Sequence, residues 1–124
     1  MRVIEVRPNE PARVVDIGTS LEALQKAVDG YIEFVYPFED ADICLMCNEE
    51  GKLNGSAPNR ALRDAYGAPY DIICGTFIIM GCTDDGDTRG LTPAEAQKYL
   101  AMFKEPETDF DIKLTQPRFE FFSW

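Results

Sequence analysis

Alternation of apolar and polar residues is the commonest pattern in this chain and predicts a protein built mainly from β-strands. Residues 2–7 and 12–17 both alternate in this way, and the cluster 8–11 between them contains two prolines and an asparagine. This arrangement is typical of a β-hairpin. We expect three apolar side chains of the hairpin to face inward: Val3, Val14 and Ile17.

A second hairpin is predicted over residues 31–47. Residues 31–36 alternate, residues 37–40 favour a turn, and residues 42–47 return as a partner strand. The acidic residues of this segment give it a local charge that would repel a nucleic acid strand. We therefore expect four aromatic residues to pack in the sheet and core and not to form a platform for stacking bases: Tyr31, Phe34, Tyr36 and Phe38.

The most apolar stretch of the chain is 70–80, and its β-branched and aromatic residues favour strand over helix. Gly75 interrupts this stretch and marks either a bulge or a break between two strands. Residues 54–60 before it are rich in turn-favouring types and predict a loop. For residues 61–64 the pattern is compatible with both a helical turn and an extended segment.

Two segments have the periodicity and the end signals of helices. Thr19 and Glu22 have the spacing of a capping box, as do Thr92 and Glu95, and Gly30 offers a left-handed stop to the first helix. The apolar residues recur at helical spacing, with Leu21, Leu24 and Val28 in the first helix and Ala96, Tyr99, Leu100 and Phe103 in the second.

These elements predict an α+β fold, with a mainly antiparallel sheet of five to seven strands and two helices packed on it. The length of 124 residues is suitable for one domain with a single core. We expect this domain to occupy residues 1–105. Residues 106–124 are predicted to form a C-terminal extension that lies extended or adds an edge strand.

The composition narrows the classes of function. The chain has 22 acidic and 12 basic residues, a formal net charge of −10, and no histidine. Without histidine, one chain cannot assemble a Ser-His-Asp or Cys-His catalytic group, and the acidity argues against binding to a nucleic acid backbone. The sequence also shows no nucleophile paired with a base. We therefore expect a protein that is not an enzyme and that needs no cofactor.

The cysteines are expected to be free and buried. Cys44 and Cys47 have the C-x-x-C spacing, but residues three apart on a strand point to opposite faces. Cys74 and Cys82 are eight residues apart and do not complete a zinc site. The acidic loop 84–87 lacks the spacing of a calcium-binding EF-hand. No metal site is predicted.

The first residues and the hydropathy pattern predict a cytoplasmic protein. Residues 1–7 are a charged alternation without the apolar core of a signal peptide. No apolar run approaches the length of about 18 residues that a membrane span requires. We therefore expect no membrane association.

Charge is distributed unevenly in the middle of the chain. Between Ala27 and Gly51 there are seven acidic residues and no basic one, and between Lys52 and Arg63 there are three basic residues and no acidic one. In a purely structural interpretation, the cations of the second segment pair with the acids of the first. In a functional one, the acidic hairpin imitates a polyphosphate and occupies the nucleic-acid-binding groove of another protein. The candidate partner-binding residues are Glu33, Glu39, Asp40, Asp42, Glu49 and Glu50.

The cationic segment 52–63 supports an alternative hypothesis, in which it binds and sequesters a small anion such as a nucleotide. Basic side chains would contact the phosphate oxygens, and asparagine amides would add hydrogen bonds. The candidate ligand-binding residues are Lys52, Asn54, Asn59, Arg60 and Arg63.

Three segments, 21–33, 47–55 and 58–60, together with 70–73 and 75–77, resemble an uncharacterised family of small bacterial domains. The resemblance covers about residues 1–105. Members of that family look like products of phages, plasmids and conjugative elements, so the resemblance implies an accessory or counter-defence role in a mobile element. It assigns no catalytic residue. We therefore expect a non-catalytic acidic binding protein that acts on a host or mobile-element protein, with the small-anion hypothesis as the alternative.

Overall fold

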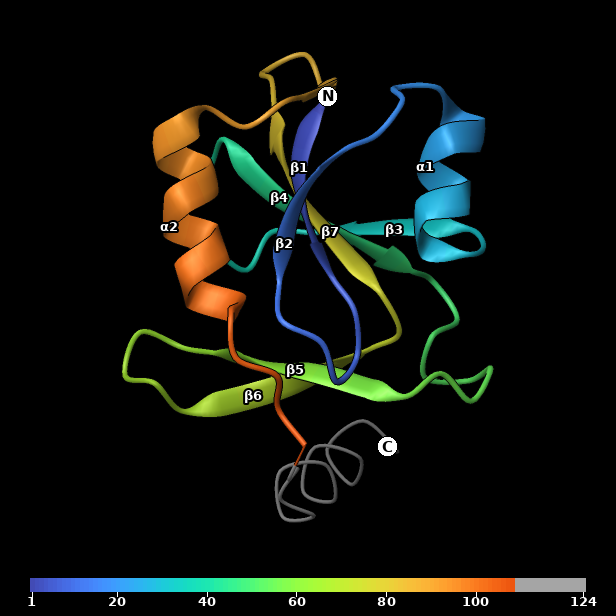
Figure 1. The fold of residues 1–124 in the computed structure, drawn as a ribbon, viewed down its shortest axis with the longest axis vertical. Helices are drawn as coiled ribbons and strands as arrows, with labels where there is room; N and C mark the ends of the chain where they lie inside the picture. The colour runs from blue at the N-terminus through green and yellow to red at the C-terminus, as the bar shows by residue number, and fades with distance from the viewer. Residues whose placement is uncertain (109–124) are drawn as a thin grey trace.

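The structure is a computed structural model that describes residues 1–108. This range contains two helices and eight strands (Figure 1). In chain order they are β1 (Arg2–Val6), β2 (Arg13–Asp16), α1 (Leu21–Val28), β3 (Ile32–Val35), β4 (Ile43–Asn48), β5 (Pro58–Arg63), β6 (Pro69–Cys74), β7 (Phe77–Cys82), β8 (Thr88–Arg89) and α2 (Pro93–Phe103).

Six strands form the main sheet, in the order β2-β1-β7-β4-β3, with β8 paired to β7. All of their pairings are antiparallel. The remaining strands, β5 and β6, form a separate two-stranded antiparallel sheet. The predicted α+β class and both predicted hairpins are confirmed; the separate second sheet is a feature that the sequence analysis did not predict.

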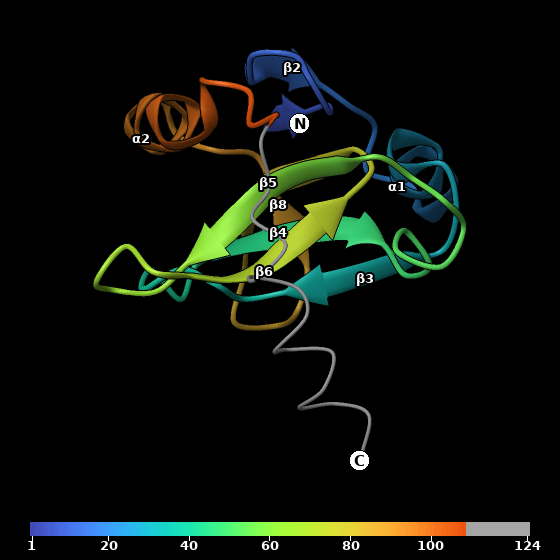
Figure 2. The ribbon, with the colours of Figure 1, turned by 90° about the horizontal axis from the view of Figure 1, so that it is seen from below.

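The two faces of the main sheet bury two apolar clusters. On β7, Phe77 and Ile79 face one cluster, which contains residues of α2, β5 and β6. Ile78 and Met80 face the other cluster, which contains Leu24 and other residues of α1. This division follows from the period of two along a strand. Figure 1 accordingly shows α1 and α2 on opposite sides of the main sheet, and Figure 2 shows the β5–β6 sheet lying across it.

The ends of α1 differ from the predicted ones by one residue. Ser20, and not Thr19, is the N-cap, and its side chain accepts a hydrogen bond from the amide of Ala23. At the other end Asp29, and not Gly30, takes the left-handed conformation, with φ of 58°. A short polar side chain tolerates this conformation better than most residues do. For α2 the capping box formed by Thr92 and Glu95 is confirmed.

Three predictions about strands need correction or completion. Val14 is 45% exposed and Val15 packs against the core in its place, because β2 is an edge strand and its Val14 face is only partly covered. Residues 58–60, predicted as loop, belong to β5, which also contains residues 61–63. Gly75 separates two strands and does not form a bulge; its φ of 81° lies in the left-handed region that glycine adopts without strain.

The predictions also differ from the structure at one short strand, and they extend beyond the described end of the chain. β8 has two residues and was not predicted. The predicted C-terminal extension begins at residue 106, but only 106–108 are described, and they form neither helix nor strand. The prediction of an extended or edge-strand segment over 109–124 lies outside the described residues.

Candidate functional site

Two clefts lie side by side along the β5–β6 sheet. One has a volume of about 460 Å³ and lies between β6 and the β3–β4 hairpin; we call it the Glu33 cleft. The other has a volume of about 420 Å³ and lies between the β5–β6 sheet and α2; we call it the Met102 cleft. Pro37, Leu62 and Tyr70 line both. The separate two-stranded sheet therefore forms a wall of both clefts.

The Glu33 cleft is acidic around an apolar interior. Its lining includes the carboxylates of Glu33, Glu49 and Asp71 and the ammonium group of Lys52, which gives these four groups a net charge of −2. Lys52 forms an ion pair with Asp71, with 2.5 Å between Nζ and Oδ1. Buried or half-buried apolar side chains complete the lining: Val35, Cys47, Leu62 and Ile73.

Three of the four cysteine thiols have a raised pKa. Burial, with the nearby carboxylate of Glu33, raises the pKa of Cys47 to about 11, and burial also raises the pKa of Cys74. Burial and the neighbouring Cys82 raise the pKa of Cys44 to about 12. Since the thiolate is the nucleophile and metal ligand, these shifts disfavour the reactive form of the three side chains. All four cysteines are free thiols.

The predicted placement of the C-x-x-C pair is confirmed. Cys44 belongs to the cluster beneath α1, whereas Cys47 belongs to the cluster beneath α2, so the two thiols lie on opposite faces of the main sheet. Within residues 1–108 no group of three or more cysteine, aspartate or glutamate side chains is placed to hold a metal ion.

The six candidate partner-binding acids lie along the β3–β4 hairpin and in the turns at its ends. Glu33 and Glu49 line the Glu33 cleft, and Glu39 lines the Met102 cleft. Asp40 is half-buried and the other five are exposed. None of the six takes part in an ion pair among residues 1–108. The five ion pairs found there use other acids: Glu5 in two of them, and Asp71, Glu95 and Glu107 in one each. The five exposed candidates are Glu33, Glu39, Asp42, Glu49 and Glu50.

The structural interpretation, in which the cations of 52–63 pair with the hairpin acids, is wrong. Lys52 pairs with Asp71 on β6, and Arg63 pairs with Glu107, beyond α2. Both acids are distant in sequence from the hairpin and were brought to these cations by the fold. The hairpin carboxylates are therefore not neutralised by the cationic segment that follows them.

Arg60 was predicted to contact a ligand, but it is a structural residue with 1% of its surface exposed. Its Nε and Nη2 both donate to the carbonyl of Phe103 at the end of α2, and Nη2 also donates to the carbonyl of Glu10 at 2.6 Å. Carbonyl groups at a helix C-terminus carry partial negative charge and attract a cation. The guanidinium group thereby joins β5 to α2 and to the β1–β2 turn.

Asn59 is likewise corrected from a candidate ligand contact to a structural residue, because it is completely buried. Its Nδ2 donates to the carbonyls of Val6 and Gly75, and its Oδ1 accepts from Arg60. A buried amide must have such partners to offset the loss of water. The loop pattern around 54–60 gave no signal for this role.

The other candidate ligand-binding residues do not converge on one space. Asn54 Oδ1 accepts from the amide and hydroxyl groups of Ser56 and so closes a turn. Lys52 lines the Glu33 cleft, whereas Arg63 lines the Met102 cleft. No anion-binding group of several cations is therefore formed by the five predicted residues.

The comparisons with known proteins identify a family but no activity. A family model described as "Domain of unknown function (DUF3846)" matches residues 1–104. The chain belongs to the DUF3846 family. No curated protein and no solved structure matches it. Neither helix of residues 1–108 is long and apolar enough to cross a membrane.

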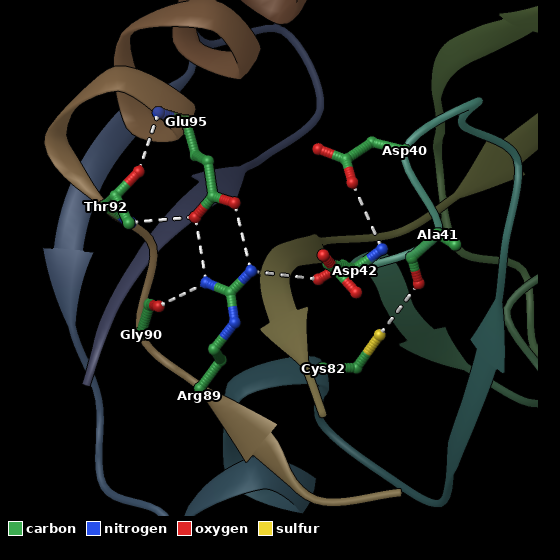
Figure 3. Close-up of polar contacts among 8 residues, drawn as sticks. All are labelled: Asp40, Ala41, Asp42, Cys82, Arg89, Gly90, Thr92 and Glu95. Atoms are coloured by element: carbon green, nitrogen blue, oxygen red, sulfur yellow. Dashed lines mark hydrogen bonds and ion pairs between the residues drawn. The ribbon is translucent and has the colours of Figure 1, made fainter. Parts of the chain in front are cut away.

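In this DUF3846 domain the acidic end of the β3–β4 hairpin is attached to the start of α2 (Figure 3). The amide of Asp42 donates to Asp40 Oδ1, and Arg89 Nη2 donates to the Asp42 carbonyl. The guanidinium of Arg89 also donates to both carboxylate oxygens of Glu95, at 2.8 and 3.0 Å. The turn between β3 and β4 therefore has a fixed backbone, while the side chain of Asp42 stays exposed.

Proposed function

We propose that this DUF3846 domain is a non-catalytic binding protein of a mobile element that occupies a basic, nucleic-acid-binding surface of a host protein. The observation that supports this function best is the set of six hairpin carboxylates without an ion-pair partner among residues 1–108. An excess of like charge on one surface destabilises the free protein. Basic groups of a partner would remove that cost and would gain from complementary charge.

The shape of the hairpin supports the comparison with a polyphosphate. β3 is the edge strand of the main sheet and pairs only with β4 among the described strands. β4 has six residues and so extends roughly 20 Å at about 3.3 Å per residue. Glu33 on β3 and the carboxylates in the turns at both ends of the hairpin therefore place negative charge along this edge, as the phosphates of a nucleic acid strand do.

The mobile-element origin and the cytoplasmic location are also part of the proposal. The assignment to a mobile element, with a counter-defence role in the host cytoplasm, rests on the sequence resemblance described above. The alternative, sequestration of a nucleotide by 52–63, has less support, because Lys52 and Arg63 are already paired with carboxylates and Arg60 is buried.

The proposal is tested by neutralising the hairpin without changing its shape. The variant Glu39→Gln/Asp40→Asn/Asp42→Asn removes three charges and leaves the amide oxygens to accept the same hydrogen bonds. Purified host DNA-binding proteins are assayed for displacement of a fluorescent DNA by the wild type and the variant. We expect the wild type to displace DNA in a salt-sensitive manner and the variant to require at least about tenfold more protein.

A matched control separates a specific surface from net charge. The variant Asp16→Asn/Glu22→Gln/Asp29→Asn also removes three charges, but from β2 and α1. We expect it to displace DNA about as well as the wild type. An equal loss in both triple variants, or no displacement from any DNA-binding protein tested, would overturn the proposal.

A further inference from the structure

The Glu33 cleft combines three kinds of lining that together suit one type of side chain. Two of its three carboxylates, Glu33 and Glu49, are exposed and outside every ion pair of residues 1–108. Two tyrosines, Tyr36 and Tyr70, also line it, and they are 65% and 37% exposed. The remaining surface is largely apolar. Carboxylates, aromatic faces and an apolar wall are the groups that receive a long cationic side chain.

We propose that the Glu33 cleft binds a single arginine side chain of the partner protein. This inference deepens the proposed function and rests on it for the biological source of the arginine. The net charge of −2 disfavours an anionic ligand and favours a cation. A volume of about 460 Å³ is within the range of small-ligand sites and is too small for a folded element.

Arginine fits the cleft better than lysine does. A guanidinium group is planar, stacks on an aromatic ring and donates two parallel hydrogen bonds to a carboxylate. Its three methylene groups would lie along the apolar side chains Val35, Leu62 and Ile73 while the charged end reaches Glu33 or Glu49. A lysine ammonium is a hydrated point charge and would gain less from Tyr36 and Tyr70.

The residues around the cleft hold its acidic wall in place. The thiol of Cys47 is 3.9 Å from Glu33 Oε1 and donates a weak hydrogen bond to it. Asp71 is neutralised by Lys52, so Glu33 and Glu49 carry the excess charge. A Cβ on Gly51 would lie 2.5 Å from the carbonyl oxygen of Cys74, so the turn after β4 approaches β6 as closely as only glycine allows.

The test uses the full chain labelled with ¹⁵N and a defined probe, N-acetyl-L-arginine methylamide. NMR titration should shift the amide signals of Glu33, Val35, Glu49 and Asp71 with a Kd in the millimolar range, as expected for one side chain. The probe N-acetyl-L-citrulline methylamide has the same shape without the charge and should cause no such shifts. The corresponding lysine probe should bind more weakly than the arginine probe.

Variants assign the binding to the lining residues. Glu33→Gln and Glu49→Gln should each raise the Kd of the arginine probe about three- to fivefold. Tyr36→Ala should raise the Kd of the arginine probe about threefold. The matched control Tyr66→Ala removes a tyrosine that is 95% exposed and lies outside both clefts, and it should leave Kd unchanged. Thermal unfolding of each variant establishes that it is folded.

The outcomes distinguish this inference from the proposed function. If the arginine and citrulline probes act equally, or if Glu33→Gln and Glu49→Gln leave the arginine Kd unchanged, the cleft is not an arginine site. The proposed function would still stand if the variant Glu39→Gln/Asp40→Asn/Asp42→Asn no longer displaces DNA. If the arginine probe binds as expected but no DNA-binding protein is occupied, the cleft assignment holds and the proposed function fails.

Discussion

At the scale of single residues, the most informative side chain is that of Arg60. It is almost completely buried, and burial lowers its pKa. Its donors reach carbonyls of Phe103 and Glu10 and the amide oxygen of Asn59. A buried charge is tolerated only when its hydrogen bonds are made, and removing it leaves those oxygens without donors.

We predict that Arg60→Ala lowers the free energy of unfolding by about 3 kcal/mol or more, because it leaves buried carbonyl groups unpaired and opens a cavity. The measurement is urea denaturation followed by circular dichroism. Lys52→Ala serves as the control, since it removes an exposed ion pair and should cost less than about 1 kcal/mol. If Arg60→Ala were no more damaging than Lys52→Ala, the structural role of Arg60 would be wrong.

At the scale of elements, the start of α2 carries the most complete set of local interactions. Thr92 and Glu95 satisfy each other's amide groups, Pro93 occupies the first helical turn, and Arg89 binds the Glu95 carboxylate. The hydrogen bonds from Arg89 are the main cause of a pKa for Glu95 of about 2, lowered from 4.5. A carboxyl group with a lowered pKa stabilises the fold above its unfolded pKa and loses that effect as it is protonated.

We predict that Glu95→Gln destabilises the protein at neutral pH by about 1 kcal/mol or more, and that this difference shrinks between pH 4.5 and 2. Glutamine keeps the capping hydrogen bond but cannot form the ion pair with Arg89. Thermal unfolding midpoints of both proteins across that pH range provide the measurement. A difference that is the same at pH 7 and near pH 2 would contradict the ion-pair explanation.

Several elements could be predicted because their signals are local. Turn residues between alternating segments gave β1–β2 and β3–β4, and the spacing of Thr92 and Glu95 gave the start of α2. β5 could not be predicted, because four consecutive residues of it are buried and so remove the alternation. Their burial depends on α2 and β1, which are distant in sequence.

At the scale of the whole molecule, six of the ten basic side chains among residues 1–108 are held in ion pairs or in the interior. Arg60 is buried, and Lys52, Arg63 and Arg89 pair with carboxylates. With a formal net charge of −10, the described surface therefore keeps carboxylates outside every ion pair, and the hairpin acids are among them. Such a surface repels phosphates and attracts basic partners.

We predict that nucleotides do not stabilise the protein. A panel of nucleoside mono-, di- and triphosphates at millimolar concentration should leave the thermal unfolding midpoint unchanged, since binding would raise it by mass action. The nucleotide-binding hypothesis for 52–63 makes the opposite prediction. A concentration-dependent rise with one nucleotide, lost in Lys52→Ala, would favour that alternative over the proposed function.

The candidate site was only partly accessible to sequence analysis. The six acids were found because charge is visible in the sequence, and the exposure of five of them follows from the cost of burying carboxylates. The Glu33 cleft was not found, since Tyr36 was expected in the sheet or core and is in fact 65% exposed, as Tyr31 is at 69%. An alternating pattern gives the face of a strand but not whether another element covers that face.

The sequence by itself determined the hairpins, the start of α2, the acidity and the opposite orientations of Cys44 and Cys47, because each depends on neighbouring residues or on composition. The tertiary structure decided which charges are neutralised, that Asn59 and Arg60 are interior, and where β6 leaves a cleft beside β3. These features depend on groups brought together from distant parts of the chain, and the energy of a charge is set by those neighbours and by its access to water.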